Sequence, residues 1–363
     1  MSDAAAREDL LTHARLSIPY KRGDFALTNW IATDDLSNGI IIETSFRGAR
    51  FDRATLRETL FIRCDLSGTS FAGASLEGCR FIECDLSRTN FEASTLLSAS
   101  FVSCAMNPAG FSRMTVSDCN FLKCDLARTR WVGARIDGCA LLECVLDEVD
   151  FSGMVATRMI ANKADLRAAR LDGLVLDTVL LVEVDLSGCD LTSVSLARVN
   201  MTGGHLGEAN LAGVDLSGSF LQECILAGAD LSGVNAPQAF FAKSDLTGAR
   251  FTDARLTNAN FMGARLGGAD FSGADLRESV MVGAQAPGAR FAGADLSYAL
   301  LNVSRLEGAD FSRTELLRTN LHRAVTNGVL YLGATGQPLG TDQERALAEL
   351  YSPYKVRSAT EED

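Results

Sequence analysis

The stretch that decides the fold is residues 268–276, which read Gly268-Ala269-Asp270-Phe271-Ser272-Gly273-Ala274-Asp275-Leu276. A large apolar residue recurs every five residues, and a small residue stands two positions before it. From Leu36 to Leu321 this spacing holds at 58 consecutive central positions, and every one of them is apolar. A helix would scatter such a repeat around its circumference, and a strand would alternate it between two faces. The chain is therefore predicted to turn a corner at each repeat, as repeat proteins do.

A second period defines the coil. Central aromatic residues recur every ten residues in the first third of the chain, and most central residues between them are leucine. A coil of four repeats, or twenty residues, would have two opposing aromatic walls and two aliphatic walls, with successive coils about 4.8 Å apart. The aromatic positions are Phe51, Phe61, Phe71, Phe81, Phe91, Phe101, Phe111, Phe121 and Trp131.

Residues 268–276 resemble the pentapeptide-repeat family, whose unit is Ala-(Asp/Asn)-Leu-x-x. The resemblance implies an all-β solenoid, a right-handed quadrilateral β-helix with four repeats per coil. Residues 31–325 would form about 14 such coils. Residues 1–30 are expected to be an N-terminal cap with a short helix, and residues 326–363 a C-terminal cap with another.

The expected helices lie near the two ends. Residues 3–18 carry apolar side chains at helical spacing, and residues 341–344 have the form of a capping box before another apolar series. We expect both helices to close the open ends of the core. The apolar residues concerned are Leu10, Leu11, Ala14 and Ile18 in the first segment, and Ala346, Leu347, Leu350 and Tyr351 in the second.

The formal net charge is −12, and acidic residues concentrate between residues 177 and 245, where Arg198 and Lys243 are the only basic ones. Such a concentration could orient a charged partner. We call this set the acidic band. It comprises Asp177, Glu183, Asp185, Asp190, Glu208, Asp215, Glu223, Asp230 and Asp245.

The ten cysteines occupy the small inward position of the repeat, and three pairs have C-x4-C spacing. Their shared position predicts buried thiols that fill the core, and no cofactor or metal is expected. A zinc or iron–sulfur site, or a redox role, is the alternative that the spacing suggests. One column should contain Cys64, Cys84, Cys104, Cys124 and Cys144.

No catalytic motif is present. The three histidines, His13, His205 and His322, have no nucleophile or metal partner in a motif, and His205 and His322 occupy outward positions. Glycine recurs as the corner residue of the repeat rather than in a phosphate-binding or dinucleotide-binding pattern. We therefore predict that the chain is not an enzyme.

The most specific functional signal is apolar residues at outward positions of one wall. Soluble monomers rarely leave a large contiguous apolar patch in water, so this wall should be covered by a second copy of the chain or another protein. Residues 1–30 are the alternative cover. We call this the apolar wall; its predicted contact residues are Leu60, Ile62, Ile82, Val102, Leu122, Leu142, Leu180, Val182, Phe220, Phe240, Val280, Val282 and Leu300.

These observations predict a non-enzymatic scaffold that uses the apolar wall for homodimerisation or for binding a protein partner. The resemblance implies an alternative, because some family members mimic duplex DNA and bind type II topoisomerases such as gyrase, protecting them from inhibitors. The acidic band suits that role without direct nucleic-acid binding. The outward arginines that follow the band oppose it; these are Arg250, Arg255, Arg265, Arg277 and Arg290.

The sequence shows neither a signal peptide at its start nor a run of 18 apolar residues. Both patterns mark chains that enter or cross membranes. A cytoplasmic location without membrane contact is therefore expected.

Overall fold

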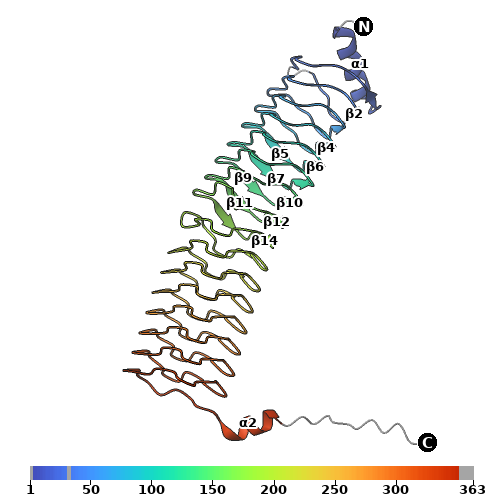
Figure 1. The fold of residues 1–363 in the computed structure, drawn as a ribbon. Coiled ribbons are helices and arrows are strands. Elements are labelled where there is room, and N and C mark those ends of the chain that lie inside the picture. The colour runs from blue at the N-terminus through green and yellow to red at the C-terminus, as the bar shows by residue number, and fades with distance from the viewer. Residues whose placement is uncertain (1–2, 31–33, 351–363) are drawn as a thin grey trace, which may run out of the picture.

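The computed structural model describes residues 3–30 and 34–350, which form a long β-solenoid with one short helix near each end (Figure 1). The coils stack regularly from the N-terminal to the C-terminal side. This confirms the all-β solenoid predicted from the five-residue repeat. Residues 31–33 and 351–363, including the predicted helical residue Tyr351, lie outside the described residues.

The regular strands are short and form two parallel sheets. The nine-stranded sheet runs in the order β1-β2-β3-β4-β6-β8-β10-β12-β14, and the five-stranded sheet in the order β13-β11-β9-β7-β5. The first comprises β1 (Tyr20–Lys21), β2 (Ile40–Ile42), β3 (Leu60–Ile62), β4 (Arg80–Ile82), β6 (Ser100–Val102), β8 (Asn120–Leu122), β10 (Ala140–Leu142), β12 (Ile160–Asn162) and β14 (Leu180–Val182). The second comprises β5 (Thr95–Leu97), β7 (Thr115–Ser117), β9 (Arg135–Asp137), β11 (Val155–Thr157) and β13 (Val175–Asp177).

Strand pairing confirms the twenty-residue coil, because Phe61 is aligned with Phe81 and Phe81 with Phe101. The nine strands of the larger sheet account for about eight turns of the solenoid. Beyond β14 the pairing continues as isolated bridges rather than strands, as far as Asn320 and Leu339. In this region Asn200 forms an Asx turn, in which its Oδ1 accepts a hydrogen bond from the Thr202 amide at 2.9 Å.

Four walls follow one another along each coil. The apolar wall carries central residues 61, 81 and 101; the second wall carries 66, 86 and 106; the third wall carries 71, 91 and 111; the fourth wall carries 76, 96 and 116. The apolar wall and the third wall are opposite each other. Both are aromatic inside from Phe51 to Trp131, as the ten-residue period predicts.

The core is built from stacked rings. The Phe61 and Phe81 ring centroids lie 5.0 Å apart with an interplanar angle of 3°, and Phe101 continues the stack at 4.9 Å. Phe71, on the opposite wall, meets Phe81 edge to face with 6.4 Å between centroids. Offset-stacked and edge-to-face rings are the favoured aromatic geometries and contribute about 0.5–1.5 kcal/mol per pair beyond surface burial.

The corners require left-handed backbone. The residue two positions after a central residue has positive φ, as at Gly73 (φ 66°) and Glu83 (φ 53°). This conformation costs a non-glycine residue roughly 1–2 kcal/mol. At Glu83 the backbone N–H donates to the Val102 carbonyl of the next coil at 2.9 Å, which helps to offset that cost.

Helix α1 (Asp3–Arg15) buries Leu10, Leu11 and Ala14 in the hydrophobic core at the N-terminal end. Its Arg7 guanidinium lies 4.7 Å from the centre of the Trp30 ring and pairs with Asp34. The coil pattern begins before the expected boundary at residue 31: β1 pairs with β2 at an offset of 21 residues.

Helix α2 (Gln343–Leu350) does not bury the last coil among the described residues. Leu332 is 82% exposed, and Leu347 of the helix itself is 68% exposed. Asp342 caps α2 by accepting the Arg345 amide at 3.0 Å, so the helix starts one residue later than the capping box at 341–344 predicts. The coil pattern also extends past residue 325, because backbone pairing to Leu339 does not require the apolar repeat.

Replacement of Phe81 by alanine should lower the free energy of unfolding by about 3–5 kcal/mol, because it leaves a cavity between stacked rings. Phe220→Ala is the matched control, since Phe81 is fully buried and Phe220 points outward. Phe220→Ala should lower the free energy of unfolding by much less than Phe81→Ala does. Urea denaturation of both variants measures the difference, and equal losses would contradict the inward assignment of Phe81.

Candidate interaction surface

The apolar wall is exposed at residues such as Leu180, Phe220 and Phe240, and α2 lies over its C-terminal end at His322. Parallel bridges join Leu180, Asn200, Phe220 and Phe240 in one outward column, which then continues through Asn260, Val280 and Leu300. The predicted column is therefore confirmed. Nine of the predicted contact residues are half-buried, namely Leu60, Ile62, Ile82, Val102, Leu122, Leu142, Val182, Val280 and Val282; Leu180, Phe220, Phe240 and Leu300 are exposed.

Phe220 and Phe240 form the most prominent feature of this wall. Their ring centroids lie 4.9 Å apart with an interplanar angle of 12°, and the residues are 40% and 37% exposed. The rings are attached at outward positions, so they do not fill the core. Each ring packs on one side against the other and keeps much of its remaining surface in water.

Polar residues divide the wall. Asn200 and Thr202 interrupt it before the phenylalanine pair, and Asn260 follows the pair one coil later. Sequence reasoning missed Met262 and Val303, which are exposed on the same wall. Met262 follows a central residue, as several recognised members do, so the repeat frame could have identified it.

A charged margin follows one edge of the apolar wall. It consists of the corner residues, where acidic and basic side chains alternate and pair between adjacent coils. Such exposed pairs contribute little to stability but can set the register of a partner. The pairs are Arg63 with Glu43 at 2.8 Å, Lys123 with Glu143 at 3.7 Å, Lys163 with Glu183 at 3.7 Å, and Lys243 with Glu223 at 3.5 Å.

The acidic band does not form one surface. A coil of twenty residues carries successive acidic residues to different sides of the solenoid, so closeness in sequence does not place them together. Glu183 and Glu223 lie at the edge of the apolar wall; Asp185, Glu208 and Asp245 on the second wall; Asp190 and Asp230 on the third; and Asp177 and Asp215 on the fourth.

Most of the band is also paired with basic residues. Six of its nine carboxylates form ion pairs, which reduces the field that a partner would meet. Asp190 and Asp215 cap turns instead, accepting the Thr192 and Ser217 amides. The ion pairs join Asp177 to Arg198, Glu183 to Lys163, Asp185 to Arg167, Glu223 to Lys243, Asp230 to Arg250 and Asp245 to Arg265.

The cysteines are free thiols, nine of them buried and Cys144 half-buried, which confirms their inward placement. They do more than fill space. The Cys104 thiol donates to the Phe81 carbonyl at 3.4 Å, as the Thr69 hydroxyl does to the Phe46 carbonyl at 2.9 Å. Burial raises the pKa of Cys79 and of Cys224 to about 12. Inward Cys, Thr and Ser therefore share one hydrogen-bonding role.

Residues 3–30 and 34–350 contain neither a metal-binding cluster nor a membrane-spanning helix. No group of three or more His, Cys, Asp or Glu side chains is placed to hold a metal ion. Neither helix in this part of the chain has the length and apolar character needed to cross a bilayer.

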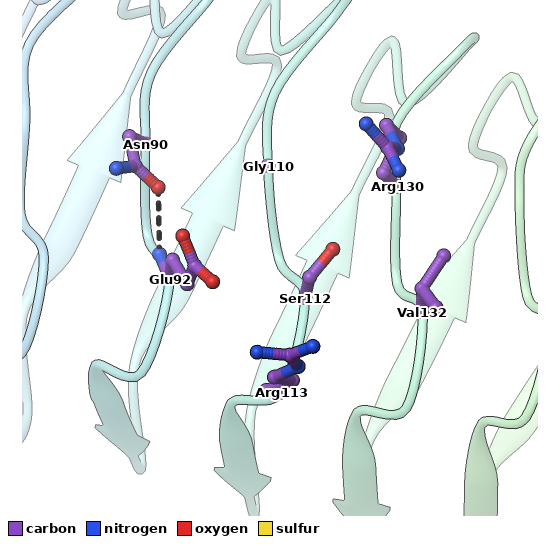
Figure 2. Close-up of a pocket in the computed structure, with 7 residues that line it drawn as sticks. All are labelled: Asn90, Glu92, Gly110, Ser112, Arg113, Arg130 and Val132. Atoms are coloured by element: carbon purple, nitrogen blue, oxygen red, sulfur yellow. Dashed lines mark hydrogen bonds between the residues drawn. The ribbon is translucent and has the colours of Figure 1, made fainter.

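A notch of about 410 Å³ opens on the third wall, opposite the apolar wall. Figure 2 shows Ser112 and Arg130 on neighbouring coils beside Gly110, which contributes no side chain. Asn90 accepts a hydrogen bond from the Glu92 amide at 2.9 Å at one side of the notch.

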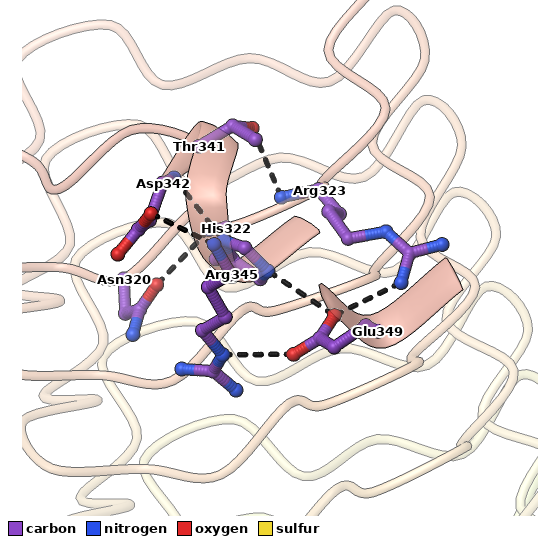
Figure 3. A network of polar contacts seen from close by, with 7 residues as sticks. All are labelled: Asn320, His322, Arg323, Thr341, Asp342, Arg345 and Glu349. Atoms are coloured by element: carbon purple, nitrogen blue, oxygen red, sulfur yellow. Dashed lines mark hydrogen bonds and ion pairs between the residues drawn. The ribbon is translucent and has the colours of Figure 1, made fainter. Parts of the chain in front are cut away.

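His322 occupies an outward position, yet it is only 3% exposed because α2 lies over it. Its Nδ1 accepts the Asp342 amide at 3.2 Å, and its Nε2 lies 3.3 Å from a Glu349 oxygen. Figure 3 shows Arg323 and Arg345 approaching the same carboxylate, at 2.9 and 2.8 Å. Sequence reasoning missed this network because it depends on where α2 docks.

The repeat models identify the family. The model described as pentapeptide repeats (8 copies) matches residues 35–68, 162–196, 195–233, 224–263, 254–291 and 289–325. A second model, described as a pentapeptide repeat region, matches residues 74–151. These matches cover more than half of the chain, so it belongs to the pentapeptide-repeat family.

Similar solved structures include HetL from the cyanobacterium Nostoc sp. strain PCC 7120, a pentapeptide repeat protein involved in heterocyst differentiation regulation. It is 24% identical, with 62% of this chain and 87% of HetL covered and a TM-score of 0.39. Full-length QnrB1, a plasmid-mediated fluoroquinolone resistance protein, is 17% identical, with 91% and 96% covered and a TM-score of 0.17. No curated protein sequence matches. The family assignment therefore rests on the repeat models.

Cys144 should be the first thiol to react with a labelling reagent in the native protein, because the other nine are buried. Its reaction should still be slow at neutral pH, since the hydrogen bond with Cys124 and burial both raise the pKa of Cys144. Mass spectrometry after timed labelling measures the order of reaction. Cys144→Ser should remove the first labelled species, and rapid labelling of most thiols would contradict the buried column.

Acidification should release α2 from the solenoid. Hydrogen bonds from Arg345, Arg323 and His322 lower the pKa of Glu349 from 4.5 to about 2. The stabilising contribution of a carboxylate with a depressed pKa is present above its unfolded-state value and is lost as the pH falls through its folded-state value. NMR signals of residues 343–350 should therefore change between pH 4.5 and about 2.

Glu349→Gln tests the same contact at neutral pH, where the variant should already show the released signals. Asp342→Asn is the control, because it keeps a capping oxygen at the start of α2. Unchanged signals in Glu349→Gln would show that the carboxylate does not hold the helix.

Proposed function

We propose that this protein is a non-enzymatic interaction scaffold that binds another protein, beginning with a second copy of itself, through the apolar wall. The observation that carries the proposal is the stacked and exposed pair of Phe220 and Phe240. Aromatic side chains at the centre of an interface commonly contribute more than about 1 kcal/mol each to binding. The solenoid holds both rings in place before association, which limits the entropy lost on binding.

The surroundings of the pair support this role. Leu180 lies two coils before Phe220, and Val280 lies two coils after Phe240. The charged margin offers pairs such as Lys243 with Glu223 beside the apolar contact. An apolar centre with a polar rim is the usual composition of a protein interface.

The alternative of a DNA mimic for a topoisomerase has weaker support. A mimic of duplex DNA presents its negative charge along one continuous surface, whereas the acidic band is spread over four walls. Ion pairs such as Asp230 with Arg250 reduce its charge further. The apolar wall therefore remains the better-supported surface.

Replacement of both Phe220 and Phe240 by serine should abolish self-association without unfolding the protein, because both rings point outward. Ile225→Ser is the matched control, since Ile225 is an exposed apolar residue on the second wall. Light scattering measures the mass, and circular dichroism checks that the β-content is retained.

A wild type that is monomeric at every concentration, together with a double variant that loses stability, would contradict the proposal. That combination would mean that the rings contribute to the fold rather than to an interface.

A further inference from the structure

The notch on the third wall exists because one residue lacks a side chain. Gly110 has no positive φ, and a Cβ built on it would meet only Asn90 Oδ1, at 3.8 Å. That distance is an ordinary van der Waals contact. Backbone geometry and packing therefore do not require glycine here, in contrast to corner residues such as Gly133 with φ 65°.

The same wall shows what occupies this position elsewhere. In the segment Asp270-Phe271-Ser272, the Asp270 carboxylate accepts the Ser272 amide at 3.0 Å and the Ser272 hydroxyl at 2.6 Å. Arg290, one coil later, forms an ion pair with the same carboxylate. Partial burial alone would raise the pKa of Asp270, but the hydrogen bonds from Arg290 and Ser272 hold it below its usual value.

A second segment repeats the arrangement. Asp230 accepts the Ser232 amide at 3.0 Å, and Arg250, one coil later, lies 3.6 Å from its carboxylate. The pKa of Asp230 is lowered by the hydrogen bond to Ser232 and by the charge of Arg250. The wall thus holds one set of three donors, around Asp270, and a second set, around Asp230, in which the Ser232 hydroxyl has no hydrogen-bond partner.

The notch holds the same donors without the carboxylate. Gly110-Phe111-Ser112 occupies the slots of Asp270-Phe271-Ser272, and a parallel bridge joins Gly110 to Arg130 as another joins Asp270 to Arg290. Within residues 3–30 and 34–350, the Ser112 amide, the Ser112 hydroxyl and the Arg130 guanidinium have no hydrogen-bond or ion-pair partner. Figure 2 shows the Ser112 hydroxyl on the coil of Gly110 and the Arg130 guanidinium on the next coil.

We propose that this notch is a binding site for a carboxylate. The carboxylate would occupy the position that the aspartate side chain has at Asp270 and that is vacant at Gly110. The ligand is a free carboxylate or an acidic side chain presented by a protein; both supply the same two oxygens. Ser112 would donate two hydrogen bonds to one oxygen, and Arg130 would pair with the other, as in the Asp270 set. Charge-assisted hydrogen bonds of this kind are stronger than neutral ones.

Two further side chains set the charge of the site. Arg113 lines the notch and has no ion pair in the described part of the chain, so it adds positive charge. Glu92 lines it as well and opposes an anion. With Arg130 included, the formal charge of the lining is +1, which favours a singly charged carboxylate over a neutral ligand.

The test is a titration with sodium acetate, with sodium chloride at matched ionic strength as reference. Acetate should shift the NMR amide signal of Ser112 in the wild type and raise its melting temperature, since a ligand that binds only the native state stabilises it. Gly110→Asp should melt higher than the wild type and give no acetate response. Gly110→Ala should keep the response, and Arg130→Gln should weaken acetate binding by about tenfold.

The chain supplies a reciprocal variant. Asp270→Gly creates a second vacant set of donors, so its melting temperature should be lower than that of the wild type. Acetate should restore part of this decrease in melting temperature. The Gly110 variants keep the proposal testable if Asp270→Gly does not fold. An acetate effect no larger than that of chloride, or an unchanged response in Gly110→Asp, would overturn the proposal.

A short peptide with a single aspartate distinguishes the two sources of the carboxylate. Tighter binding of the peptide than of acetate assigns the site to an acidic side chain of a protein. Equal affinity assigns it to small free carboxylates. If neither the peptide nor acetate shifts the Ser112 signal, the notch is not a carboxylate-binding site.

Discussion

The structure depends on one constraint, the hydrogen-bonded register that places each residue over the residue twenty positions later. Because backbone groups are paired between coils, side chains in equivalent slots must stack, as Phe61 does on Phe81. An inserted residue would move every following side chain to another slot, so a register of this kind tolerates little variation inside the rod. The 21-residue offset between β1 and β2 occurs in the first coil, where no earlier coil has to stay in register.

The local repeat explains why much of the fold could be predicted. Every fifth position must face inward, so the buried cysteines and the outward pair of Phe220 and Phe240 follow from counting. The burial of His322 could not be predicted in this way, because it depends on the docking of α2 against a distant coil. The acidic band suggests one charged surface from the sequence, but it does not form one. Residues that cluster along the chain are distributed around a coil.

The two proposed surfaces use the register differently. On the apolar wall, two successive equivalent slots hold the same residue type, so Phe220 stacks on Phe240. On the third wall, complementary types alternate, and the charge at Asp270 is matched by Arg290. A departure from that alternation, at Gly110, leaves donors without an acceptor. Since the walls are opposite each other, a ligand on one leaves the other accessible.

The two ends of the rod are built differently. Leu10 and Leu11 of α1 are buried at the first coil, whereas Leu332 of the last coil remains exposed. Each coil in a solenoid contacts only its neighbours, so separation begins most easily at a coil with one neighbour and an open core. Under tension along its axis, the rod should peel from the C-terminal side. Each detached coil of twenty residues would release about 70 Å of extended chain, giving equal steps in a force–extension trace.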